Sequence, residues 1–269
     1  MYDMLGGYLL LCCKLGNARR KVLRPEQFHK FLKLGTDVRG AVGMKDCPNE
    51  LPWLLEDAQQ MQQYAKNIPM DIIPLLLTDD RYPALVKERL KELAPGILWA
   101  KGNLELLNRP AVAVVGSRGI DAAGLCFATA VGRMAARCGY VLVSGNAEGA
   151  DRAGQEACLE AGGSVISVVA DSLLNKRVHD RILYLSENDF DLNFDRERAL
   201  SRNQVIHSMG QRTYVAHAKV GRSGTWSGVA RNLNGGWSPI YMHNNGSEAA
   251  EVIAEKGGTL VSIEELECL

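Results

Sequence analysis

Apolar and polar positions follow two alternating patterns along the second part of the chain. From residue 111 onward, short apolar runs recur, and each is followed by a turn and a longer segment with helical periodicity. Short apolar runs predict buried strands, and the longer segments predict helices. The predicted strands cover 111–115, 140–143, 164–169, 182–186, 213–217, 238–242 and 259–262, and the predicted helices cover 121–137, 150–161, 173–181, 196–209, 225–233 and 247–256.

Strands that alternate with helices are typical of a parallel sheet covered by helices on both faces. We therefore predict an α/β fold with a Rossmann-like parallel sheet. Two further apolar runs, 72–77 and 97–100, flank a short amphipathic helix over 84–93. The segment before them has a helical pattern, which predicts a small helical N-terminal region over 1–70 and a main domain over 71–269.

Three turns that contain glycine follow predicted strands of this sheet. They are Gly116-Ser117-Arg118, the stretch from Ser144-Gly145 through Gly149 to Asp151, and Arg222-Ser223-Gly224-Thr225. The carboxyl ends of parallel strands meet at one edge, where ligands bind in such sheets. Backbone N–H groups and the positive end of a helix dipole favour an anion there. The turns therefore predict one shared phosphate pocket, and the first lacks the G-x-G-x-x-G pattern of dinucleotide sites.

Several polar and aromatic side chains near these turns allow two interpretations. Asp151 in a first helical turn is more typical of a brace to a neighbouring loop than of a ligand for a ribose or a base edge. Asn203 lies inside a predicted helix, where asparagine is unfavourable, which favours a specific hydrogen bond. Trp226 and Tyr214 are candidates for stacking on a base, and Trp226 has core packing as its alternative.

Composition limits the class of protein without identifying it. The 269 residues are 46% hydrophobic with a formal net charge of zero. Residues 196–231 hold seven Lys or Arg against one acidic residue, whereas 246–269 hold six Glu against one Lys, so the charge is segregated. The seven cysteines show no metal-binding spacing, and we expect neither disulfides nor a metal, in a cytoplasmic setting. No apolar run is long enough to span a bilayer.

A set of short motifs resembles the DprA/Smf family (DNA-processing protein A), in a divergent branch of the Rossmann-like group that includes the LOG phosphoribohydrolases. The motifs begin at residues 80, 112 and 143 and read DRYPAL, VAVVGSR and VSGNAEGAD. They continue with EAGG from residue 160, Arg202-Asn203, and Ser223-Gly224-Thr225. They cover residues 78–245 in the order of the family. Departures include Trp226 where the family usually has leucine.

The resemblance implies a pocket that holds phosphates of single-stranded DNA, and help in loading a RecA-type recombinase during DNA uptake in competence. It also implies self-association, and we expect a homodimer. By position, the pocket residues are Gly116, Ser117, Arg118, Ser144, Gly145, Gly149, Asp151, Arg202, Asn203, Ser223, Gly224 and Thr225, to which we add Arg222 from the third turn. No cofactor is expected.

Catalysis is less expected than binding. The LOG enzymes carry P-G-G-x-G-T-x-x-E, whose glutamate assists the chemistry, and Gly228 takes its place here. An arginine such as Arg202 binds phosphate but cannot perform acid–base chemistry at neutral pH. A non-catalytic nucleic-acid-binding protein is therefore the leading hypothesis. A sensor of a small nucleotide signal, for instance in anti-phage defence, is the alternative, and a hydrolase with a relocated acid (Glu148 or Asp151) is less favoured.

Overall fold

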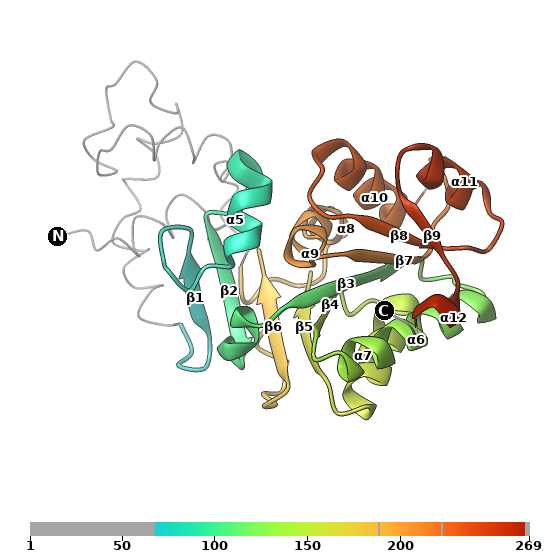
Figure 1. Cartoon of the computed structure of the whole chain (residues 1–269). Helices are drawn as coiled ribbons and strands as arrows, with labels where there is room; N and C mark the ends of the chain where they lie inside the picture. The colour runs from blue at the N-terminus through green and yellow to red at the C-terminus, as the bar shows by residue number, and fades with distance from the viewer. Residues whose placement is uncertain (1–67, 188, 222, 267–269) are drawn as a thin grey trace, which may run out of the picture.

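The computed structural model describes residues 68–266 apart from residues 188 and 222, and its core is one nine-stranded sheet (Figure 1). From edge to edge the strands are β1 (Ile73–Leu76), β2 (Ile97–Gly102), β6 (Ile182–Ser186), β5 (Ser164–Val168), β4 (Val141–Ser144), β3 (Ala111–Gly116), β7 (Thr213–His217), β8 (Ile240–His243) and β9 (Thr259–Val261). The expected helices before residue 68, and the expected boundary at residue 70, concern a segment outside the described residues.

The sheet is parallel from β6 to β9, which confirms the Rossmann-like prediction for most of its width. The other edge differs, because β2 pairs antiparallel with both β1 and β6. An apolar run of four to six residues predicts a buried strand whether that strand runs parallel or antiparallel to its neighbours. The sequence pattern therefore could not distinguish the two orientations.

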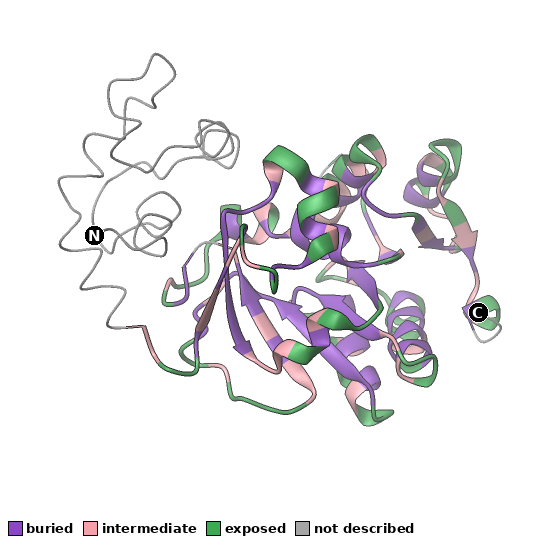
Figure 2. Cartoon of the chain, turned by 60° about the vertical axis from the view of Figure 1, so that its left-hand side comes forward, coloured by how far each residue is buried: buried purple, intermediate pink, exposed green. Residues whose placement is uncertain are grey.

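Helices cover both faces of the sheet, because successive strand residues point to opposite sides. On β3, Val112 and Val114 pack toward one core cluster, whereas Ala113 and Val115 pack toward the other. The first cluster receives α6 (Ala122–Arg137), α7 (Ala150–Glu160) and α12 (Ile263–Leu266); the second receives α5 (Ala84–Leu90), α9 (Asn203–Met209), α10 (Gly224–Gly235) and α11 (Glu248–Glu255). The central strands are therefore buried on both faces (Figure 2).

Two predicted helices differ in the structure. The segment 173–181 is irregular, because the Ser172 hydroxyl accepts a hydrogen bond from the Leu174 amide (3.1 Å) and Asp171 pairs with Lys176 (2.7 Å). Such local side-chain bonds compete with helix formation. The predicted helix 196–209 is divided into α8 (Arg196–Ser201) and α9 by a turn at Arg202. Two 3₁₀ segments, η1 (Lys91–Leu93) and η2 (Leu104–Asn108), complete the described elements, none of which is a helix able to cross a membrane.

Candidate functional site

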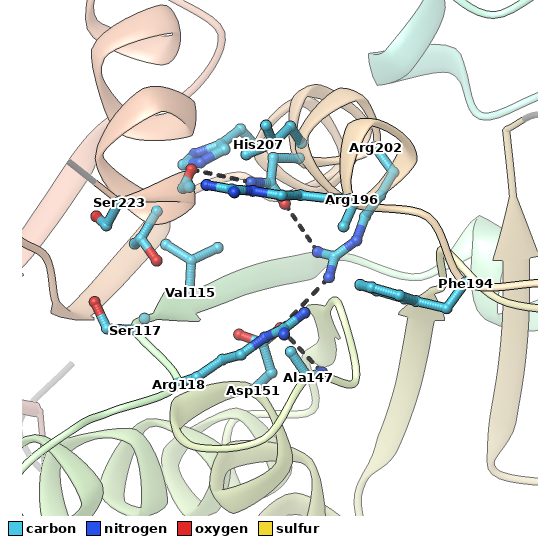
Figure 3. A pocket seen from close by; sticks show the side chains of 16 residues that line it. Val115, Ser117, Arg118, Ala147, Asp151, Phe194, Arg196, Arg202, His207 and Ser223 are labelled. Atoms are coloured by element: carbon cyan, nitrogen blue, oxygen red, sulfur yellow. Dashed lines mark hydrogen bonds and ion pairs between the residues drawn. The ribbon is translucent and has the colours of Figure 1, made fainter. Parts of the chain in front are cut away.

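A cavity of about 290 Å³ lies at the carboxyl edge of the sheet, beside β3. The neighbours of β3 are β4 on one side and β7 on the other, so the strand order reverses direction at this strand. Ligands in open α/β sheets bind at such a switch point. Its walls are Val115, Gly116, Ser117, Arg118, Ala147, Asp151, Phe194, Arg196, Ala199, Leu200, Arg202, Asn203, His207, Ser223, Gly224 and Thr225 (Figure 3). The three turns singled out in the sequence therefore contribute to one cavity, as predicted.

A second cavity of about 390 Å³ adjoins the first and shares Arg118, Ala147, Phe194 and Arg202 with it. Gly145, Asn146, Glu148, Arg152, Ala170, Asp171 and Lys176 form its other walls. The two cavities are therefore neighbouring parts of one surface depression, with the Arg118 and Phe194 side chains where they meet.

The turn after β3 is tied to β7. The Ser117 backbone amide and hydroxyl both donate to the His217 carbonyl, at 3.1 and 3.4 Å. Gly116 must lack a side chain, because a Cβ there would collide with the Cβ of Ala150 at the start of α7. This packing leaves Arg118 as the group of this turn that extends over the cavity, with its guanidinium 5.4 Å from the centre of the Phe194 ring.

The turn after β4 is held from inside by Asp151, as the brace interpretation predicted. Its buried carboxylate accepts hydrogen bonds from the amides of Gly145 (3.1 Å) and Ala147 (3.4 Å). Burial raises the pKa of Asp151, and the Arg202 guanidinium 4.0 Å away opposes that shift. Gly149 has a φ of +88°, and a Cβ there would lie 2.6 Å from the Ser117 carbonyl oxygen. The β3 and β4 turns therefore pack backbone to backbone.

Arg202 and Asn203 connect this turn to α10. Arg202 donates to the Gly145 carbonyl (3.2 Å) and to the Asn203 side-chain oxygen (2.9 Å). The Asn203 amide nitrogen in turn donates to the Gly224 carbonyl (3.2 Å). The specific hydrogen bond that the sequence suggested for Asn203 is therefore present, at the boundary of two helices rather than inside one.

Helix α10 points its N-terminus at the cavity. The Ser223 hydroxyl caps this helix by accepting from the Trp226 amide (3.0 Å) and donates to the Lys219 carbonyl (3.2 Å). The first amides of a helix have no intrahelical acceptor, so those of Gly224 and Thr225 are available to an anion. Arg222, which we placed in this site, lies outside the described residues.

Three serines predicted to bind phosphate make hydrogen bonds within the protein. Ser144 is fully buried, does not line the cavity, and its hydroxyl accepts from Gln155 (2.8 Å). Ser117 and Ser223 do line the cavity, but each hydroxyl hydrogen is directed at a backbone carbonyl. A hydroxyl has a single hydrogen to donate. The donors that face the cavity are therefore mainly arginines and the start of α10.

Trp226 is not brought into the cavity. It is partly buried and packs against the larger core cluster, so the core interpretation describes its position. Tyr214 is also buried in the core. The aromatic ring that does line the cavity is Phe194, whose 54% exposure is large for a phenylalanine. Sequence reasoning missed Phe194, because it lies in a polar stretch with no periodic pattern.

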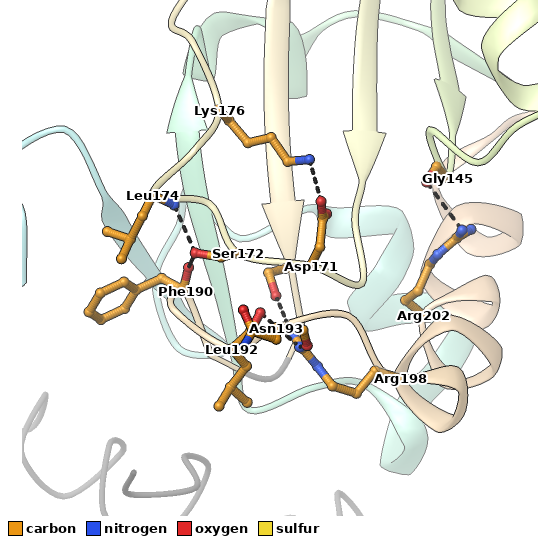
Figure 4. A network of polar contacts seen from close by, with 11 residues as sticks. Gly145, Asp171, Ser172, Leu174, Lys176, Phe190, Leu192, Asn193, Arg198 and Arg202 are labelled. Carbon is orange, nitrogen blue, oxygen red and sulfur yellow. Dashed lines mark hydrogen bonds and ion pairs between the residues drawn. The ribbon is translucent and has the colours of Figure 1, made fainter.

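The loop that carries Phe194 is ordered by a buried arginine (Figure 4). Arg198 donates to the carbonyls of Leu192 (3.2 Å) and Asn193 (2.7 Å) and to the Ser186 hydroxyl (3.3 Å). Asp195 caps α8 by accepting from the amides of Glu197 and Arg198. Of the seven basic residues noticed over 196–231, Arg198 therefore holds the loop, and Arg196 lines the cavity.

Positive charge dominates the cavity wall. Arg118, Arg196 and Arg202 line it, against one carboxylate, Asp151, which already has two amide donors. Burial lowers the pKa of Arg202, although an arginine stays charged across the physiological range. The described residues include no cluster of His, Cys, Asp and Glu able to hold a metal. The cavity is therefore suited to an anionic oxygen ligand.

Two titratable groups stand near this wall, Glu187, which is partly buried, and His207, which is buried. Burial raises the pKa of Glu187 to about 7, against a hydrogen bond from Ser201 and the charges of Arg202, Arg198 and Arg231. Burial, with the charge of Arg202, lowers the pKa of His207 to about 3. His207 is therefore neutral at physiological pH, and neither group was assigned a role from the sequence.

The chain was compared with known families and proteins. A family model described as DNA recombination-mediator protein A matches residues 74–266. The DNA processing protein DprA of Streptococcus pneumoniae is 31% identical over 274 residues, with 91% of this chain and 92% of that protein covered.

Two solved structures share the fold. The X-ray structure of DprA from S. pneumoniae aligns with a TM-score of 0.82 at 24% identity, over 100% of this chain and 98% of that one. DprA from Helicobacter pylori, whose structure is described in terms of its single-stranded DNA binding mode, aligns with a TM-score of 0.61 at 23% identity, over 73% and 94%.

Proposed function

This chain belongs to the DNA recombination-mediator protein A family, and we propose that it binds single-stranded DNA without cleaving it, with backbone phosphates in the cavity at the switch point. The names of its relatives support a role in DNA processing, and the description of the H. pylori protein supports single strands as the ligand. The predicted site residues that line the cavity carry over into this proposal, with Arg118 as the main phosphate ligand and with the side chains of Ser117, Ser223 and Asp151 holding the turns.

The observation that carries the proposal is the meeting of Arg118, Arg196 and the N-terminus of α10 around one cavity. These groups come from three separate segments, and each favours a negatively charged oxygen. Phosphate contacts supply most of the affinity of proteins for nucleic acids. The adjoining cavity supports a chain that continues past the first nucleotide rather than ending there.

Phe194 is the proposed platform for a base. Its exposed ring stands beside Arg118 and lines both cavities. Stacking of a base on an aromatic ring contributes about 1–3 kcal/mol and tolerates any base. A phosphate on Arg118 with its base on Phe194 would use two groups already in contact with one another.

The charge of Arg118 provides the direct test. We expect Arg118→Ala to weaken binding of a labelled thymidine oligonucleotide about tenfold at ~0.1 M salt and to reduce the slope of log K against log salt by ~0.7, because one phosphate contact is lost. Fluorescence anisotropy over a salt series measures both quantities.

Arg133→Ala is the matched control, because Arg133 is an exposed arginine of α6 that lines neither cavity. It removes the same charge and should leave affinity and slope near those of the parent. Equal behaviour of the two variants would contradict the placement of DNA in this cavity.

A sensor of a small nucleotide is the second candidate, and the size of the first cavity favours it. About 290 Å³ is close to the lower limit of ~300 Å³ for small-molecule sites. A single nucleotide has few phosphates, so its affinity should change little with salt, whereas a strand should show a steep slope. Mass spectrometry of a ligand that copurifies with the protein would identify either one.

The proposal extends to partners by family membership. We propose that a RecA-type recombinase receives the bound strand in the cytoplasm during DNA uptake, and that the protein acts as a homodimer with residues 1–70 as a separate region. Light scattering tests the dimer, limited proteolysis tests the boundary near residue 70, and recombinase filament formation on coated single strands tests the transfer.

A further inference from the structure

His207 lines the cavity although neither the sequence motifs nor the proposed phosphate contacts assign it a role. It lies on α9, is 1% exposed, and stands on the α10 side of the cavity, across from Arg118 and Asp151 (Figure 3). Because it is neutral at physiological pH, it cannot attract an anion by charge as the neighbouring arginines do.

The hydrogen bonds behind His207 determine which of its ring nitrogens carries the proton. The Ser238 backbone amide can only donate, so the Asn232 atom 2.9 Å from it is the side-chain oxygen. The Asn232 amide nitrogen then faces the Ser238 hydroxyl (3.1 Å) and the His207 Nδ1 (3.2 Å). An NH₂ group has no free lone pair to accept with, so Nδ1 accepts. The proton of the neutral ring is therefore on Nε2.

The Nε2–H group faces the gap between α9 and α10. A Cβ at Gly228 of α10 would lie 3.0 Å from Nε2 and 3.3 Å from the Cβ of Asn203. The absence of a side chain at position 228 is therefore what leaves room beside Nε2. Among the residues that the structure describes, the His207 ring has one hydrogen-bond partner, Asn232, which occupies the other nitrogen.

We propose that His207 is a hydrogen-bond donor with a fixed tautomer, and that its Nε2–H binds a phosphate oxygen of the nucleotide in the cavity. This inference rests on the proposed function, because it requires a nucleotide at this place. A phosphate favoured by the first turn of α10 would lie beside α9, since Asn203 already bonds the Gly224 carbonyl there. Nε2 carries a proton and so offers no lone pair to a ligand, which makes His207 a binding group and not a general base.

The tautomer is tested first, on the full-length protein without ligand. Long-range ¹H–¹⁵N correlation spectra distinguish the two neutral tautomers of each of the five histidines, and His207→Gln assigns the signal. We expect the Nε2–H form of His207 from pH 5.5 to 8. A protonated ring, or the Nδ1–H form, would overturn the proposal whatever the protein binds.

The ligand contact is tested by adding a thymidine oligonucleotide, inorganic phosphate or thymidine to the same sample. We expect the oligonucleotide and phosphate to move the Nε2 proton signal downfield and thymidine to leave it in place. A shift with thymidine alone would mean that Nε2–H binds a base or sugar oxygen, which contradicts the phosphate assignment. If fluorescence anisotropy shows that the oligonucleotide binds but the Nε2 proton signal does not move, this inference alone is overturned. If the parent protein does not bind the oligonucleotide at all, the proposed function is overturned.

Substitutions give an independent measurement of the same contact. We expect His207→Met, which keeps the bulk but has no donor, to lose about tenfold in affinity for the oligonucleotide, and His207→Gln, which keeps an N–H donor, to lose about threefold. His179→Gln is the control, since His179 is exposed and lines neither cavity. If both variants fold and lose the same amount of affinity for the oligonucleotide, the donor role of His207 is overturned. If both variants unfold, the spectra of the parent protein decide.

Discussion

Arg202 stabilises the site by joining groups that are distant in sequence. It donates to the Gly145 carbonyl, lies 4.0 Å from the Asp151 carboxylate, and orients the Asn203 side chain. A charged group this deeply buried needs hydrogen-bond and charge partners. The terminal nitrogens of Arg202 have them, whereas its Nε has no partner among the described residues. Arg202 is therefore as much a part of the scaffold as of the ligand-binding surface, and its substitution is a poor test of DNA binding alone.

Gly145 offers a cleaner test of this packing. A Cβ at position 145 would collide with the Arg202 guanidinium, which must then leave its carbonyl partner. We expect Gly145→Ala to lower the free energy of unfolding by about 1–3 kcal/mol, the usual range for overpacking. Urea denaturation measures the change. Gly119→Ala is the control, because a Cβ there meets nothing within 4 Å, and a similar loss in both variants would contradict this account.

Glu187 predicts a pH dependence of stability. Burial raises its pKa to about 7, above the ordinary value of 4.5, so the folded protein binds more protons than the unfolded chain between these values. The free energy of unfolding contributed by this group therefore falls as the pH rises from about 4.5 through 7. The charges of Arg202, Arg198 and Arg231 limit the effect, and Oε1 itself is buried and unpartnered among the described residues.

We expect Glu187→Gln to remove this decrease, because an amide does not ionise. Urea denaturation of parent and variant at pH 5, 6, 7 and 8 should show a difference in stability that moves in favour of the variant as the pH rises. A constant difference across the series would mean that Glu187 does not titrate in this range.

At the scale of the elements, the loop between β6 and α8 decides the shape of the cavity. The residues of this loop that the structure describes form no helix or strand. The Arg198 side chain holds the loop by donating hydrogen bonds to two loop carbonyls and to the Ser186 hydroxyl (Figure 4). The loop presents Phe194 to Arg118 across the cavity. This loop must therefore be ordered if the Phe194 ring is to be in place for a base to stack on it.

We expect Arg198→Ala to release this loop and to weaken oligonucleotide binding about three- to tenfold, because the Phe194 ring must then be ordered on binding. Hydrogen exchange should accelerate in peptides that cover 189–195. Phe194→Ala should weaken binding to a similar degree with little change in exchange. An Arg198→Ala protein with parental exchange rates would contradict the role assigned to its three hydrogen bonds.

At the scale of the whole molecule, the cavity joins the two halves of the sheet. Its walls come from the end of β3 and the turns after β3 and β4 on one side of the switch point, and from the segment after β7 on the other. A ligand held by both halves binds the folded protein and not the unfolded chain. Binding therefore adds to stability by mass action.

We expect a thymidine oligonucleotide at 100 times its dissociation constant to add ~2.7 kcal/mol to the free energy of unfolding. Thermal denaturation measures this as a higher Tm. Arg118→Ala, with its tenfold weaker binding, should keep only about half of the shift (~1.4 kcal/mol) at the same oligonucleotide concentration, while Arg133→Ala keeps all of it. A shift that is the same for both variants would locate the ligand elsewhere.

Much of the fold could be predicted, because its signals are local. The strands β3, β4, β5 and β7 and the helices α6 and α7 begin and end within about two residues of the predicted bounds. The three turns do meet at one edge, as the parallel order required. The antiparallel β2 and the irregular 173–181 could not be predicted, because strand direction and side-chain bonds such as Asp171 to Lys176 depend on neighbours that periodicity does not describe.

The local pattern of the chain is enough to give the alternation of strands and helices, and hence the edge at which glycine turns and arginines gather. Which side chains face the cavity depends on the folded arrangement. The Ser117 hydroxyl donates to the carbonyl of His217, one hundred positions away along the chain. Phe194 lines the cavity from a loop that has no periodic sequence pattern. Asn232, on another helix, determines the tautomer of His207. Hydrogen bonding and burial depend on which groups meet in space, whereas periodicity records only which neighbours along the chain share a face.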